Sequence, residues 1–113
     1  MSGITTHVLD VARGRPAQAV PVILERQTED TWRELGRAAT DADGRVRQLL
    51  PAGHALSAGI YRLTFLTRSY FDALGIEGFY PEAAIVFTVR DPDQHYHVPL
   101  LLSPFGYSTY RGS

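Results

Sequence analysis

Gly59-Ile60-Tyr61-Arg62-Leu63-Thr64-Phe65-Leu66-Thr67 is the stretch that decides the fold class. Its apolar and polar side chains alternate, and it is rich in β-branched and aromatic residues, which is typical of a strand with one buried face. The residues that follow, 69–74, break this two-residue period. Ser69 is a candidate cap and Gly75 a candidate stop for a single short helix. We therefore expect a strand followed by a short helix near residues 69–75.

Further candidate strands lie on both sides of this segment, and turn-forming residues separate them. Pro21 falls inside one of them and has no backbone N–H to donate, so we place that strand near a sheet edge. Asp41-Ala42-Asp43-Gly44 is a strong turn signal, because aspartates bond to nearby backbone and glycine adopts positive φ. The other candidate strands are residues 3–11, 20–25, 32–39, 45–49, 83–90, 95–102 and 107–111.

About eight short strands and at most one helix favour an all-β, antiparallel sandwich of two sheets over an α/β fold. The 113 residues are enough for one domain and no more. We therefore expect a single domain over residues 1–113.

The composition excludes several classes of protein. There is no cysteine, so disulfides, thiolate metal sites and covalent thiol chemistry are excluded. The net charge is -1 and no basic stripe is present, which disfavours nucleic-acid binding. No apolar run approaches the roughly 20 residues of a membrane helix, and the residues up to His7 do not resemble a secretory signal. We expect a cytoplasmic protein that binds neither nucleic acid nor membrane.

Histidine supplies the main candidates for chemistry, because its pKa of about 6.5 lies nearest neutral pH. His95 and His97 should share a face, since residues two apart on a strand point to the same side. Such a pair could hold a metal ion, but no carboxylate or cysteine lies at a suggestive spacing, and structural zinc needs four ligands. General acid–base catalysis needs only one or two histidines, and His7 lies in another strand. An ordinary surface or core role stays open for each histidine.

Two further features could contribute to a site. Arg45 follows a turn, where its guanidinium could bind a carbonyl oxygen and offset negative charge, although a solvated turn arginine would look the same. Residues 104–113 stay aromatic and patterned, whereas chain ends usually become polar and disordered. A terminus docked in a sheet could present Tyr110 and Ser113 to a pocket, and an ordered strand without that role is equally compatible. No motif for a side-chain nucleophile is present, so an enzyme of this sequence would use an activated water.

Five motifs, taken together, carry a resemblance to one family. The longest runs from His97 to Ser113 and ends in Tyr-Arg-Gly-Ser, and Thr6-His-Val-Leu-Asp10 is the second. Gly14-Arg-Pro-Ala17, Asp43-Gly-Arg45 and Phe79-Tyr-Pro81 match in order and approximate spacing. On these motifs the sequence resembles the 5-hydroxyisourate hydrolases, the enzymatic relatives of transthyretin. The resemblance covers essentially the whole chain. The terminal tetrapeptide separates those enzymes from the hormone carrier.

The resemblance implies a transthyretin-like sandwich of two four-stranded antiparallel sheets with one short helix. It implies a homotetramer with active sites between its dimers. There His7, Arg45, His97 and the C-terminus would converge on one sheet face. It also implies hydrolysis of 5-hydroxyisourate to 2-oxo-4-hydroxy-4-carboxy-5-ureidoimidazoline in urate degradation. We expect that reaction to need no metal or other cofactor.

The resemblance also suggests roles for individual residues. His7 and His97 would orient and deprotonate the attacking water, and the sequence does not decide which is the base. Arg45 would hold the substrate and stabilise the oxyanion, while Tyr110 and Ser113 would position the substrate or the histidines. The alternative is a non-catalytic, transthyretin-like carrier of a small aromatic ligand. The polar histidine pair disfavours it, because a carrier channel is lined mainly by apolar groups.

Overall fold

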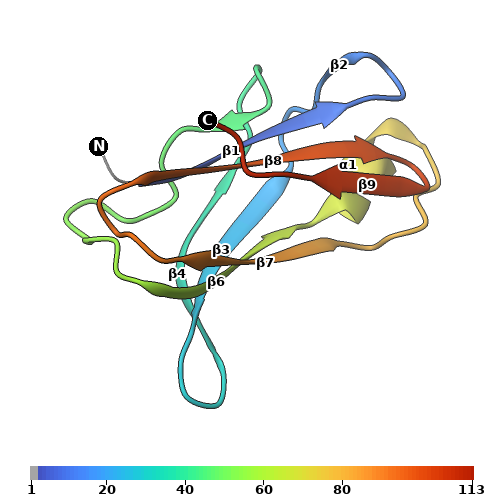
Figure 1. Ribbon diagram of the computed structural model, residues 1–113. Helices are drawn as coiled ribbons and strands as arrows, with labels where there is room; N and C mark the ends of the chain where they lie inside the picture. Colours follow the sequence, from blue (N-terminus) through green and yellow to red (C-terminus); the bar gives the residue numbers. More distant parts are fainter. Residues whose placement is uncertain (1–2) are drawn as a thin grey trace.

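Two β-sheets pack face to face in the computed structural model, which describes residues 3–113 of the expected domain (Figure 1). Sheet A contains β1 (Gly3–Asp10), β2 (Arg15–Pro16), β5 (Arg45–Val46), β8 (His95–Ser103) and β9 (Gly106–Thr109). Sheet B contains β3 (Pro21–Gln27), β4 (Trp32–Ala39), β6 (Gly59–Phe65) and β7 (Ala83–Val89). Helix α1 (Thr67–Leu74) follows β6. The expected all-β sandwich with one short helix is confirmed.

Sheet A differs in the number and direction of its strands from the expectation of two four-stranded antiparallel sheets. Its order is β2-β1-β8-β9, and it has five strands because β5 pairs with the same edge of β1 as β2 does. β1 and β8 are parallel. A parallel pair needs a long crossover connection, and the chain between these strands forms all of sheet B. Sheet B has the order β4-β3-β6-β7 and is antiparallel throughout.

Three local predictions also need correction. The strand that contains Pro21 is central and not at an edge, because proline is tolerated as the first residue of a strand. The helix begins at Thr67, and Ser69 lies inside it and does not cap it. Arg15 and Pro16, which lie outside the predicted strands 3–11 and 20–25, form β2. Gly75 ends the helix in the left-handed conformation, as predicted.

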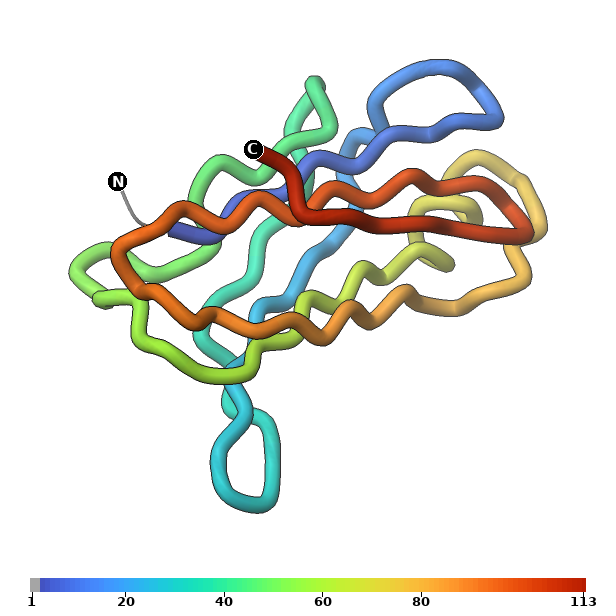
Figure 2. Tube along the Cα trace, in the orientation of Figure 1, coloured from blue at the N-terminus to red at the C-terminus, as the bar shows by residue number. Residues whose placement is uncertain are grey.

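The core lies between the sheets and is built from alternate residues of the long strands. Ile4, Thr6 and Val8 of β1 are buried there, whereas Thr5 and His7 point to the opposite, outward face of sheet A. Figure 2 shows that the C-terminal end turns away from β9 and finishes beside β8, while the hairpin between β3 and β4 projects from the sandwich. Sheet A therefore presents one outward face with the C-terminus close to it.

Candidate active site

The outward face of sheet A carries the histidines and the arginine that the sequence singled out. The register of β1 with β8 places Thr5 beside His97, and its register with β5 places His7 beside Arg45. His95 and His97 share this face, because they are two residues apart on β8. The structure thus brings together side chains from three strands that are far apart in the sequence.

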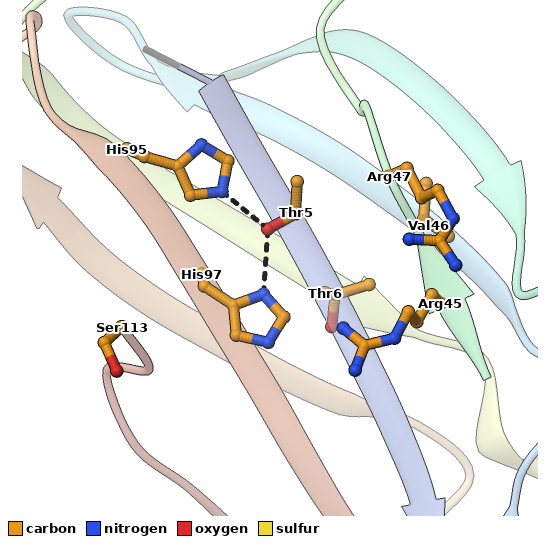
Figure 3. A pocket seen from close by; sticks show the side chains of 8 residues that line it. All are labelled: Thr5, Thr6, Arg45, Val46, Arg47, His95, His97 and Ser113. Atoms are coloured by element: carbon orange, nitrogen blue, oxygen red, sulfur yellow. Dashed lines mark hydrogen bonds between the residues drawn. The ribbon is translucent and has the colours of Figure 1, made fainter. Parts of the chain in front are cut away.

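A cavity of about 270 Å³ opens on this face (Figure 3). Its lining residues are Thr5, Thr6, Arg45, Val46, Arg47, His95, His97 and Ser113. Guanidinium, imidazole and hydroxyl groups dominate this wall, so the cavity suits a small ligand rich in carbonyl oxygens.

The hydroxyl of Thr5 holds two imidazole rings at the cavity. Its Oγ1 lies 2.9 Å from Nε2 of His95 and 2.8 Å from Nδ1 of His97. The Nε2 of His97 is on the other edge of its ring, directed to the side where the Arg45 guanidinium lies (Figure 3). That nitrogen is therefore available to a molecule in the cavity.

The surroundings of His97 lower its pKa below the ordinary value for histidine. Burial is the largest cause, because an imidazolium ion loses hydration inside the protein. The positive charges of Arg45, His7 and His95 act in the same direction. A lowered pKa keeps His97 neutral at neutral pH, and the neutral ring can accept a proton.

A tight turn positions Arg45. The carboxylate of Asp41 accepts hydrogen bonds from the backbone N–H groups of Arg45 and Asp43, both at 2.9 Å, and these bonds lower the pKa of Asp41. Gly44 has a φ of 77°, and its carbonyl accepts a 2.7 Å bond from Val8 N–H. A Cβ at Gly44 would lie 2.4 Å from the carbonyl oxygen of Val8. Only glycine fits there, so the turn is fixed against β1.

His7 lies next to the cavity and is not among its lining residues. Its Nε2 is 2.8 Å from the backbone carbonyl oxygen of Asp43. A carbonyl only accepts hydrogen bonds, so this nitrogen carries a proton and the neutral ring has its free lone pair on Nδ1. His7 thereby ties the turn that carries Arg45 to β1, and a positive charge on its ring, when it is protonated, lowers the pKa of His97.

The C-terminal residues are docked against β8, as expected from their pattern. Gly112 N–H donates a 2.9 Å bond to the carbonyl of His97. A Cβ at Gly112 would lie 2.6 Å from Cδ2 of His97, so a larger residue could not come this close. Arg111 donates a 2.9 Å bond to Gln94 and lies over the ring of Tyr96 at 4.5 Å. These contacts place Ser113 in the cavity wall.

Tyr110 is not brought to this cavity within one chain. Its side chain is 55% exposed and lines a separate, mainly apolar cleft of about 240 Å³ with residues of β7 and β8. Conversely, Thr5, His95 and Arg47 line the cavity, although the catalytic and substrate-binding residues predicted from the sequence did not include them. Thr5 could have been suggested by its position two residues before His7, which puts both side chains on one face.

Residues 3–113 contain neither a cluster of metal ligands nor a membrane-spanning helix. Within this range no three or more His, Cys, Asp or Glu side chains are grouped so that they could hold a metal ion. The helix in this range is too short and too polar to cross a membrane.

The chain matches known proteins both in sequence and in structure. The family model described as "HIUase/Transthyretin family" matches residues 4–112. A 5-hydroxyisourate hydrolase of Caulobacter vibrioides is 49% identical over 117 residues, covering 100% of both chains. The structure of Klebsiella pneumoniae 5-hydroxyisourate hydrolase matches with a TM-score of 0.86 and 39% identity, covering 100% of each chain. Sea bream transthyretin in complex with thyroxine matches with a TM-score of 0.88 and 33% identity, covering 96% of this chain and 93% of that one. The transthyretin-like fold is confirmed.

Proposed function

Because the chain belongs to the HIUase/transthyretin family, we propose that it hydrolyses 5-hydroxyisourate to 2-oxo-4-hydroxy-4-carboxy-5-ureidoimidazoline in urate degradation. Relatives that match its full length carry the name of this hydrolase. The observation that carries the proposal is the cavity on sheet A, which His97, Arg45 and Ser113 line together. A binding site for a ring rich in carbonyl groups needs donors of this kind, and hydrolysis also needs a base.

His97 is the best placed base. Neutral water is a poor nucleophile, so a group at the site must take its proton as the oxygen attacks the ring carbonyl. The Nε2 of His97 is not used by the bond to Thr5, and the lowered pKa keeps the ring unprotonated. The Nε2 of His7 is already bonded to the Asp43 carbonyl, so His7 orients the site and supports the water or the substrate. A well-placed base contributes on the order of 10²–10⁴-fold to the rate.

Arg45 supplies the positive charge that the reaction requires. Negative charge builds on the carbonyl oxygen when water adds, and a guanidinium stabilises it with donors fixed in a plane. One well-aimed donor is worth roughly 2.7–4 kcal/mol of transition-state stabilisation. Ser113 binds the substrate from the opposite side of the cavity. Tyr110 would reach a substrate only in an assembly of several chains.

The remaining expectations form part of the same proposal. The chain acts as one domain, in the cytoplasm, and as a homotetramer with the cavity between facing dimers. The exposed position of the cavity supports this arrangement, because a second copy on this face would partly cover it and reduce its access to water.

The test follows the decay of freshly generated 5-hydroxyisourate by absorbance with purified protein. His97→Ala and Arg45→Glu should each lower kcat/KM by at least about 100-fold, since each removes a group that acts in the transition state. The fold of both variants is checked by circular dichroism. His54→Ala is the matched control, because His54 is exposed in the loop before β6 and should keep full activity. Full activity in both site variants would contradict the assignment.

The carrier function is the second candidate, because the fold also matches transthyretin in complex with thyroxine. A carrier would bind an aromatic ligand without consuming it, and its site would be mainly apolar. The histidines and arginines of the cavity favour the hydrolase. Calorimetric binding of thyroxine together with unchanged hydroxyisourate decay would favour the carrier.

A further inference from the structure

The Thr5 hydroxyl links two histidine rings that belong to different environments. Both rings line the cavity, but His97 is half-buried whereas His95 is exposed. Both rings use a nitrogen to bond the same oxygen, at 2.8 and 2.9 Å. A threonine hydroxyl has one proton, so when it donates to one ring it accepts from the other. The three side chains form a continuous path of hydrogen bonds from half-buried His97 to exposed His95, along the wall of the cavity (Figure 3).

The backbone holds this path in a fixed geometry. Thr5 and His97 are register partners on neighbouring parallel strands, and Gly3 is the partner of His95. A Cβ at Gly3 would lie 3.5 Å from Nδ1 of His95, so the ring packs against bare backbone. Because adjacent strands are rigid neighbours, the two rings stay within reach of the hydroxyl.

The proposed reaction needs such a path. Hydrolysis of a neutral ring amide gives a carboxylate and a ureido nitrogen that is not basic at neutral pH, so each turnover releases one proton. His97 takes up a proton inside the cavity and must become neutral before the next turnover. The inference therefore rests on the proposed hydrolysis.

We propose that Thr5 and His95 relay this proton from His97 to solvent. The neutral His97 ring begins with a proton on Nδ1, bonded to Thr5, and receives the substrate-derived proton on Nε2. The Nδ1 proton moves to the Thr5 oxygen, and the hydroxyl's own proton moves to Nε2 of His95. The His95 ring, now positive, releases its Nδ1 proton to a base in solvent. One proton has entered at His97 and one has left at His95, and exchange with water restores the starting tautomers.

The charges around His97 favour this direction. His7 faces the ring from β1, Arg45 faces the cavity from β5 and Arg47 from the residue just after it, and Ser113 closes it from the tail. Burial, followed by the positive charges of Arg45, His7 and His95, lowers the pKa of His97. A proton on His97 is therefore released readily toward the exposed end of the path.

The experiment compares Thr5→Val, Thr5→Ser and His95→Gln in dilute buffer and with added imidazole. Thr5→Val and His95→Gln should lower kcat by roughly 10- to 100-fold, at or below the low end of what a positioned acid–base group contributes. KM should stay unchanged, imidazole should restore kcat, and Thr5→Ser should retain it. Thr31→Val, in the projecting hairpin, is the matched control and should behave as the wild type.

A second readout does not depend on activity. Nitrogen-15 NMR of the ring nitrogens should show that protonation of His95 alters the Nδ1 signal of His97 in the wild type and in Thr5→Ser, and not in Thr5→Val. If the wild type hydrolyses 5-hydroxyisourate while Thr5→Val and His95→Gln keep full kcat, or if imidazole restores neither, the relay is wrong and the function stands. If the wild type does not accelerate the decay, both fail.

Discussion

His97 differs from the other histidines of the site in its surroundings and not in its chemistry. Its ring lies half-buried between β1 and the docked tail. Its Nδ1 is hydrogen-bonded to the Thr5 hydroxyl, and positively charged groups, Arg45 foremost, lie near the ring. These surroundings lower its pKa, so the proton-accepting form persists to a lower pH than for an exposed histidine. Because a base works in its neutral form, kcat should rise with pH through the pKa of His97 and then level off.

Arg45→Gln tests this electrostatic coupling. Removing the guanidinium removes one cause of the lowered pKa, so the pKa of His97 should rise toward the ordinary value of about 6.5. NMR titration of the His97 ring measures the shift directly, independently of the rate that the same change reduces. Arg33→Gln, on β4 of the other sheet, is the control and should leave the titration unchanged. An unchanged His97 titration in Arg45→Gln would contradict the coupling.

Gly112→Ala tests the close approach of the tail. The new methyl group would lie 2.6 Å from Cδ2 of His97, so either the ring or the tail must move. A displacement of about 1 Å in a catalytic group can cost about 100-fold in rate, and we expect a loss of that size in kcat/KM.

The melting temperature of Gly112→Ala should change little, because the tail lies on the surface. Gly106→Ala is the matched control, since a Cβ there meets only the Ser103 hydroxyl at 3.8 Å. Equal activity in the two alanine variants would show that the tail does not set the position of His97.

The sequence predicted the residues of the site that are unusual in a strand or turn, and missed the ordinary ones. His7, Arg45 and His97 stand out because their chemistry suits hydrolysis. Thr5 does not, since threonine is common in strands, and only the register with β8 shows that its hydroxyl reaches two rings. Tyr110 was grouped with the site through its motif, yet the chain directs it into a different cleft.

At the scale of elements, the sequence predicted which residues form strands better than how the strands pair. Alternation is a local property, so β4 and β6 could be placed from it to within a residue or two. The parallel pairing of β1 with β8 depends on segments far apart in the sequence. The central position of β3 also depends on distant segments, because β3 pairs with β4 on one side and with β6 on the other. Pro21, the first residue of β3, does not prevent either pairing.

One buried hydrogen bond joins helix α1 to sheet A, and Tyr70→Phe tests how much this bond contributes to stability. The Tyr70 hydroxyl donates a 2.7 Å bond to the carboxylate of Asp10, which is only 1% exposed. Burial and the neighbouring carboxylate raise the pKa of Tyr70, so the hydroxyl remains a donor throughout the neutral range. Removing it leaves Asp10 with one partner fewer and should lower the free energy of unfolding by about 1.5–3 kcal/mol.

Urea denaturation measures the effect of Tyr70→Phe. Tyr107→Phe is the control, because Tyr107 is 38% exposed and the loss of its hydroxyl should change stability by less than about 0.5 kcal/mol. Equal stability of the two variants would mean that the helix is held by apolar packing alone.

On the scale of the whole molecule, the cavity lies outside the sandwich and not in its core. The outward face of sheet A continues from the histidines along β8 to Leu101, and Val11 beside it is 54% exposed. Edge strands β7 and β9 offer unpaired backbone groups on another side of the molecule. A tetramer built from dimers requires two self-complementary surfaces, and these are the two that the proposed homotetramer would use.

Leu101→Asp tests whether the face that holds the cavity is also an interface of the proposed homotetramer. A carboxylate buried between two copies would lose its hydration without gaining a partner, at a cost of several kcal/mol. Analytical ultracentrifugation should therefore show dimers where the wild type forms tetramers, and hydroxyisourate hydrolysis should fall because the cavity stays open to water. Leu74→Asp, on the exposed side of α1, is the matched control and should keep the tetramer. A wild-type monomer with full activity would show that one chain forms the site alone, and a Leu101→Asp tetramer with full activity would show that this face is not the interface.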